Sequence, residues 1–170
     1  MPNHLSVLGI IHTAISVIAL ITGIVALFRD GKIDPGNTTG KSYILLTVIT
    51  CLTSLPIMKT GHLTTAHYVA VVILVLLPIG MYAGRIFGRA AAYIQMIVMS
   101  TTLFLSSIPA IVETLTRLPI SKPIANGAND PLIQKALSCL ALIYFTGVLY
   151  QLFILKTKKK TEQNATVKLS

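Results

Sequence analysis

Apolar residues along this chain of 170 residues gather in five long runs, and the charged residues fall in the gaps between them. A helix that crosses a bilayer needs about 17 to 25 mostly apolar residues, and each run meets that length. Strands of a membrane barrel are excluded, because they alternate over only about ten residues. The pattern predicts an all-α integral membrane protein, a five-helix transmembrane bundle with spans at 5–28, 42–58, 63–83, 90–112 and 136–155.

The composition agrees with this fold class. Hydrophobic residues make up 54% of the chain and charged residues 11%, and the mean hydropathy is +0.77. A soluble domain of this composition has too little polar surface to cover itself. We therefore expect one membrane domain over residues 1–156 and a basic, disordered cytoplasmic tail over 157–170.

The basic residues predict the orientation of the bundle. With five spans, ten of the 14 lysines and arginines fall on the side of the C-terminus and four on the side of the N-terminus. Short loops rich in Lys and Arg face the cytoplasm, so the N-terminus is expected outside and the C-terminus inside. The first run has no basic residue before it and is longer than the core of a signal peptide, which favours a retained helix. These features indicate a multi-pass protein of the inner (cytoplasmic) membrane.

The net charge of +9 is explained by this topology and by the basic tail, so we expect no nucleic-acid partner. Lys156–Lys160 directly follows the last run, where lysines meet anionic lipid headgroups at about 1 kcal/mol each. Cys51 and Cys139 fall at different depths in their spans. A disulfide between them is therefore not expected.

Small and polar residues show which faces of the helices point inward. In the first run they recur at steps of three and four, which places them on one face of a helix. We expect this seam to pack against neighbouring helices, within the chain or in a larger complex. Its members are Gly9, His12, Ser16, Ala19, Gly23 and Ala26. Thr47, Thr50, Cys51 and Ser54 form a similar stripe in the second run, as do Gln95, Thr102, Ser106, Pro109 and Glu113 in the fourth.

Three ionisable residues from three different helices fall in one outer layer of the predicted bundle. His12 lies inside the outer end of the first helix, His67 inside that of the third, and Glu113 closes the fourth. Ionisable residues are costly in a membrane and usually face a partner or a cavity. We therefore take these three residues as the candidate cofactor-binding site. Arg117, four residues after Glu113, can also neutralise it.

Several functions fit such a layer. The cofactor is unknown: His12 and His67 can ligate iron if a b-type haem is present, and with Glu113 they can line a quinone or other small-ligand pocket. Other metals are not expected. The alternatives are a small transporter or channel subunit, a homo-oligomer, and an accessory protein of a larger membrane complex with no ligand. A further possibility is that the histidines only form hydrogen bonds to neighbouring helices and bind no ligand. No motif of soluble-type catalysis occurs, so the sequence does not favour an enzyme.

Several segments together resemble a family of small uncharacterised bacterial multi-pass membrane proteins, known as a domain of unknown function. They are His12, Asp30–Ile33, Thr50–Thr53, His67, the run Glu113–Pro119 and Asp130–Pro131, and they span nearly all of the membrane part. The run from Glu113 to Pro119 is the most specific. This chain departs from the family just before the Ile-Pro of the fourth helix. The family has an aromatic pair followed by histidine there, whereas this chain has Leu105–Ser107. The resemblance implies an inner-membrane location and no established activity.

Overall fold

The computed structural model of the protein describes residues 7–57, 64–119 and 122–169. Helices account for 84% of it, and no strand occurs in these ranges. Five helices have 17 or more residues, one over each predicted run, which confirms the all-helical prediction. They are α1 (Val7–Asp30), α2 (Thr38–Ser54), α3 (Thr65–Met81), α5 (Ala91–Arg117) and α6 (Pro131–Leu169); the short helix α4 (Ala83–Ile86) and the 3-10 turn η1 (Gly88–Ala90) join α3 to α5.

Three helical segments are long and apolar enough to cross a membrane. They are Val7–Asp30, Gly88–Arg117 and Pro131–Thr161. The helix Thr65–Met81 is also apolar but has only 17 residues. At 1.5 Å per residue, α2 and α3 each rise about 25 Å, whereas α1 rises about 36 Å. These three helices indicate a membrane protein. Two shorter helices, α2 and α3, lie beside them.

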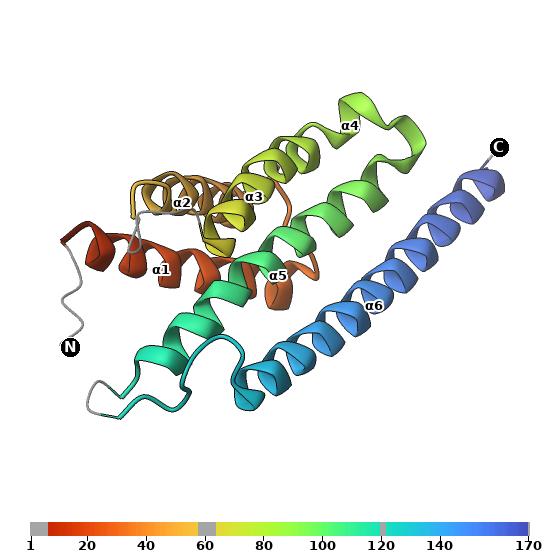
Figure 1. The fold of residues 1–170 in the computed structure, drawn as a ribbon. Helices are drawn as coiled ribbons and strands as arrows, with labels where there is room; N and C mark the ends of the chain where they lie inside the picture. Colours follow the sequence, from red (N-terminus) through yellow and green to blue (C-terminus); the bar gives the residue numbers. More distant parts are fainter. Residues whose placement is uncertain (1–6, 58–63, 120–121, 170) are drawn as a thin grey trace.

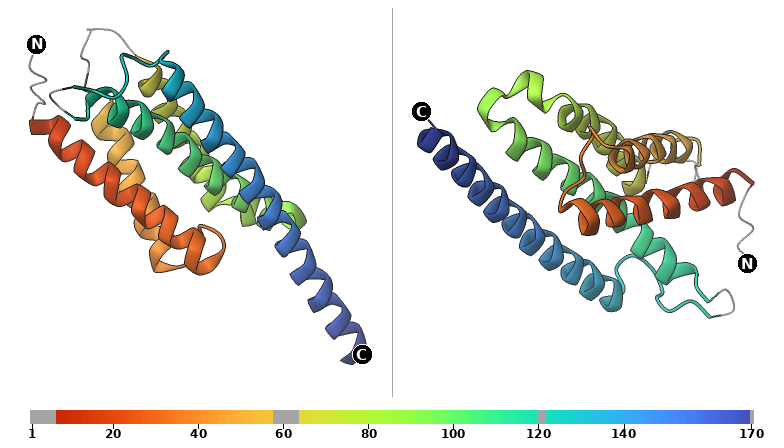
Figure 2. Two further views of the ribbon diagram at one scale, coloured as in Figure 1. Left: turned by 90° about the horizontal axis from the view of Figure 1, so that it is seen from below. Right: turned by 180° about the vertical axis from the view of Figure 1, so that it is seen from behind.

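The helices form two packed pairs and one outer helix. α1 packs against α2, α3 packs against α5, and α2 joins the pairs by packing against α3. Figure 1 shows α6 running beside α5 at the edge of the molecule, and no other long helix packs along it in the described part of the chain. In Figure 2 the start of α1 and the end of α6 lie at opposite ends of the bundle.

The seam of small residues in α1 packs inside the chain. Gly9, Ala19, Gly23 and Ala26 are buried, and His12 and Ser16 are half-buried, whereas the isoleucines on the other faces are exposed. The predicted inward face is confirmed. The buried members of the seam therefore contact neighbouring helices of the same chain.

A compact loop joins α1 to α2. Gly31 has a φ of 70°, a left-handed conformation that favours glycine just after a helix. The Asn37 side chain then accepts a hydrogen bond of 2.8 Å from the Gly40 amide and caps α2. A Cβ atom at Gly40 would lie 1.9 Å from the carbonyl oxygen of Asp34, so the loop leaves no room for a side chain there.

Asp130 and Pro131 begin α6. The Asp130 carboxylate accepts hydrogen bonds from the amides of Leu132 and Asn126, at 2.9 and 3.0 Å, and these bonds hold the pKa of Asp130 below its usual value. Proline suits the first helical position, because an amide hydrogen there has no partner within the helix.

A disordered tail was expected at 157–170, but α6 continues as a helix to Leu169. No proline or glycine follows Gly147, so nothing in the backbone ends the helix.

Candidate functional site

His12 is the sixth residue of α1 and faces α2 from a half-buried position. Its Nδ1 atom lies 3.0 Å from the Thr53 hydroxyl, near the end of α2. Ser16, one turn further along α1, places its hydroxyl 3.5 Å from Nε2 of the ring. Because two helices hold the imidazole, its orientation is fixed by the packing of α1 on α2.

The hydroxyl bonds around His12 decide which ring nitrogen carries the proton. Thr53 donates its hydroxyl proton to the carbonyl oxygens of Ile49 and Thr50, at 2.8 and 3.1 Å. The Thr53 oxygen is then left to accept, so Nδ1 of His12 is the donor. Ser16 donates to the carbonyl of His12 itself, at 2.6 Å. In the neutral ring, Nε2 therefore keeps its lone pair for another group.

Glu113 lies near His12, close enough for its carboxylate to interact electrostatically with the ring when the ring is charged. It sits on α5 one turn before the end of the helix, because α5 continues to Arg117 rather than ending at Glu113 as expected. Arg117 forms an ion pair with the Glu113 carboxylate. The structure thus brings three helices together in this layer, through His12, Thr53 and Glu113.

His67 has a different environment, at the first turn of α3. The side chain is only 5% exposed, and its Nδ1 atom lies 3.0 Å from the Thr64 amide and 2.9 Å from the Thr64 hydroxyl. Because a backbone amide can only donate, Nδ1 of His67 accepts, and the neutral ring carries its proton on Nε2. His67 therefore helps to cap α3.

The two histidines are not equivalent as ligands. A metal bound at Nε2 needs the lone pair of that nitrogen, which His12 has free and neutral His67 does not. A bis-histidine haem through His12 and His67 does not fit this arrangement. In the described ranges, no group of three or more His, Cys, Asp or Glu side chains is placed to hold a metal ion. Cys51 and Cys139 are both free thiols, as expected.

A second polar contact lies deeper in the bundle, where the sequence pattern indicated only a mildly polar interior. Tyr43 of α2 and Thr102 of α5 are fully buried and form a hydrogen bond of 2.9 Å. Thr102 donates its own proton to the Met99 carbonyl at 2.8 Å, so the tyrosine is the donor in the bond between them. Thr102 belongs to a stripe of small and polar residues that the sequence predicted. Tyr43 lies in an apolar run, and nothing in the sequence marks it as the partner of Thr102.

Comparisons with family models, with characterised proteins and with solved structures find no match for this chain. The resemblance to a family of uncharacterised bacterial membrane proteins therefore stays a prediction.

Proposed function

We propose that the chain is an integral protein of the cytoplasmic membrane that crosses it five times, with its N-terminus outside. The opposite positions of the two helical ends support an odd number of crossings. The excess of basic residues on the side of the C-terminus supports the orientation. Lys41, just inside the start of α2, has a long side chain that can reach the headgroups, which lets a helix of 17 residues cross.

Reporter fusions test this topology. A reporter after Ser170 is expected to be active only in the cytoplasm, and one inserted at Asn126 only outside. The opposite pattern would reverse the orientation, and two active fusions on one side would give an even number of spans between them.

We propose further that the outer layer binds a small ligand whose hydroxyl donates a hydrogen bond to Nε2 of His12. The head group of a reduced quinone has such a hydroxyl and is soluble in the membrane. The single observation that carries this proposal is the bond from Nδ1 of His12 to Thr53, which leaves Nε2 as an oriented acceptor. Glu113 adds a second acceptor nearby, with Arg117 balancing its charge.

Quinol binding by purified protein tests the proposal, with a short-chain ubiquinol as the probe. His12→Ala is expected to weaken binding at least tenfold, because the acceptor is lost. Thr53→Val should weaken it several-fold, because the ring then loses the partner that fixes its tautomer. His67→Ala is the matched control: it should lower the melting temperature through the lost cap and leave binding unchanged.

Two outcomes would contradict this function. Equal binding by wild type and His12→Ala would remove His12 from the site. A loss of binding in His67→Ala as large as in His12→Ala would mean that both histidines act on one ligand. A Soret band in the absorbance spectrum of the purified wild type would favour haem over quinol.

A small transport subunit is the second candidate, and the buried Tyr43–Thr102 bond favours it. Thr47, one turn from Tyr43, is also buried, so hydroxyl groups continue along the inner face of α2. Proton flux into vesicles containing the protein would distinguish the two candidates. Flux that falls in Tyr43→Phe but not in His12→Ala would favour transport over quinol binding.

A further inference from the structure

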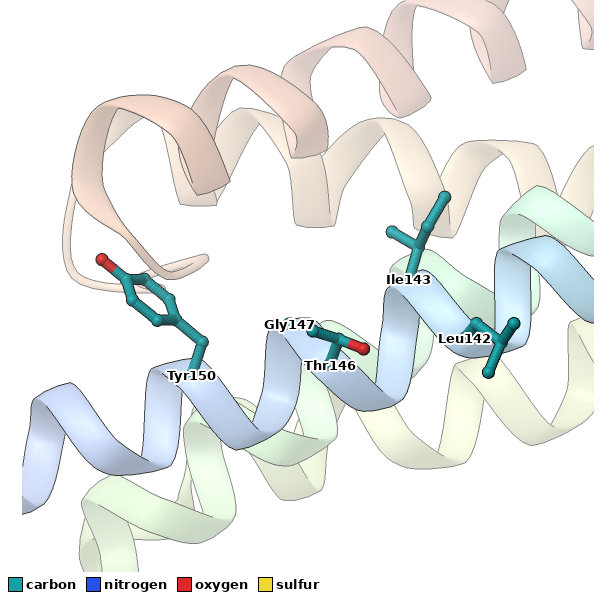
Figure 3. Close-up of a pocket in the computed structure, with 5 residues that line it drawn as sticks. All are labelled: Leu142, Ile143, Thr146, Gly147 and Tyr150. Atoms are coloured by element: carbon teal, nitrogen blue, oxygen red, sulfur yellow. The ribbon is translucent and has the colours of Figure 1, made fainter.

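A shallow apolar groove lies along an exposed face of α6. The groove holds about 520 Å³. Five residues of α6 line it: Leu142, Ile143, Thr146, Gly147 and Tyr150. In Figure 3 Ile143 and Tyr150 point toward α1, with Gly147 between them. α6 packs along α5 and not along α1 in the described ranges, and Gln151 donates a hydrogen bond of 2.8 Å to the Gly31 carbonyl in the loop after α1.

The floor of the groove is open at Gly147. A Cβ atom there would meet no other atom within 4 Å, which leaves a gap between the larger side chains on either side. Those side chains are well exposed, at 71% for Ile143 and 67% for Tyr150. They stand seven residues apart, about 10 Å along the helix. The groove is therefore a shallow apolar channel that runs along α6.

The polar end of this channel points toward the C-terminus of α6. At 100° per residue, Thr157 continues the face of Tyr150, and Lys158 and Lys160 flank it. All three are exposed. Asp30, at the end of α1, pairs with Arg29, and Asp34, in the loop after it, pairs with Lys32. An apolar channel thus leads into a positively charged surface.

We propose that this groove binds one anionic phospholipid, with an acyl chain along Ile143 to Tyr150 and the headgroup at Lys158 and Lys160. The positive charge complements a phosphate headgroup, and basic sites at helix ends are suited to such lipids. The volume falls in the range of small-molecule sites, about 300–1,000 Å³. The proposal needs the bundle in a membrane, but it does not depend on the ligand at His12.

The experiment measures lipid retained by the full-length protein. The protein is reconstituted in vesicles of equal phosphatidylglycerol and phosphatidylcholine, extracted in a mild detergent, and analysed by native mass spectrometry. Wild type is expected to keep one lipid per chain, with phosphatidylglycerol at least fivefold over phosphatidylcholine. Gly147→Leu should lose most of this lipid, because its Cβ atom meets no other atom within 4 Å and the longer side chain occupies the channel.

Two further variants keep the test specific. Phe145→Trp adds bulk on another exposed face of α6, outside the residues that line the groove, and should retain the lipid like wild type. The double variant Lys158→Gln, Lys160→Gln should keep a bound lipid but lose the preference for phosphatidylglycerol.

Equal retention by wild type and Gly147→Leu would overturn the proposal, since the lipid would then be bound elsewhere. A wild-type dimer without lipid that Gly147→Leu separates into monomers would also overturn it, and would assign the groove to a second copy of the chain.

Discussion

Glycines in two regions of the bundle have opposite surroundings. At Gly23 in α1, a Cβ atom would lie 2.8 Å from the Leu103 side chain and 2.9 Å from the Tyr43 ring. At Gly147 in α6, a Cβ atom would meet nothing within 4 Å. The same residue type therefore allows close helix packing in one region and leaves open space in the other. Small residues in a membrane helix predict close approach only where another helix packs on that face.

The difference follows from how each helix is held. α1 and α2 pack on each other, and Tyr43 of α2 bonds to α5 within a buried cluster. α6 rests on α5, with polar contacts such as the bond of 2.9 Å from Ser100 to Gln151 and a stack of Phe104 on Tyr144. We expect substitutions in the first region to affect the whole fold and those in α6 to act locally.

The largest effect is expected for Gly40→Ala. The added methyl group would meet the backbone of Asp34, which cannot move without opening the loop between α1 and α2. A loss of about 3 kcal/mol in the free energy of unfolding is expected. Gly147→Ala is the control, and it should be neutral or raise stability by up to about 1 kcal/mol. Thermal unfolding in detergent compares them; similar melting temperatures for both variants would refute the contrast.

Gly23→Leu should have the next largest effect, because its side chain must displace Leu103 and Tyr43. Overpacking of this kind costs about 1 to 3 kcal/mol. Val25→Leu, on an exposed face of the same helix, is the matched control and should change stability little. The measurement is the fraction of folded, monodisperse protein after extraction and heating. Equal tolerance at the two positions would mean that this face of α1 is not packed.

Tyr43→Phe is expected to cost about 1 kcal/mol, the usual value of one hydrogen bond. The loss stays small because Thr102 keeps its own bond to the Met99 carbonyl. Tyr68→Phe is the control, since Tyr68 is exposed. Chemical unfolding followed by circular dichroism gives both values. A Tyr43→Phe protein as stable as wild type would show that the buried bond adds nothing to the fold.

The smallest effect is the dependence of the start of α6 on pH. The pKa of Asp130 is lowered in the folded chain by bonds from the Asn126 and Leu132 amides. Its stabilising contribution is therefore present above the pKa of the unfolded chain and is lost as pH falls through the folded pKa. The protection of the Leu132 amide against hydrogen exchange, relative to the intrinsic rate at each pH, should fall at acid pH in wild type. Asp130→Asn keeps a capping oxygen and should lack this extra response.

Much of the fold could be predicted from the sequence because the membrane imposes a simple length and polarity rule. The five long helices of the described ranges lie over predicted runs, but their ends differ: α2 begins at Thr38 rather than at residue 42. The difference has a local cause, since Asn37 caps the helix while Lys41 still fits within its first turn. Hydropathy places apolar residues, whereas hydrogen bonds at the cap set where a helix begins.

The candidate site was predicted less completely. The sequence singled out His12, His67 and Glu113 by their charge and depth, and the structure places His12 near Glu113 and His67 in a cap of α3. Thr53, which fixes the His12 ring, lies 41 residues away and carries no sequence signal that links it to a histidine. Partners this far apart along the chain are brought together only by helix packing.

The sequence by itself determined that the chain is helical and apolar enough for a membrane, and that one face of α1 packs inward. These properties follow from the length of apolar runs and the helical period, which act locally. Only the tertiary structure decided that His12 keeps Nε2 free while His67 carries its proton there, and that Gly147 faces open space. The reason is physical: a tautomer depends on which groups donate nearby, and the space around a glycine depends on which helix packs against it.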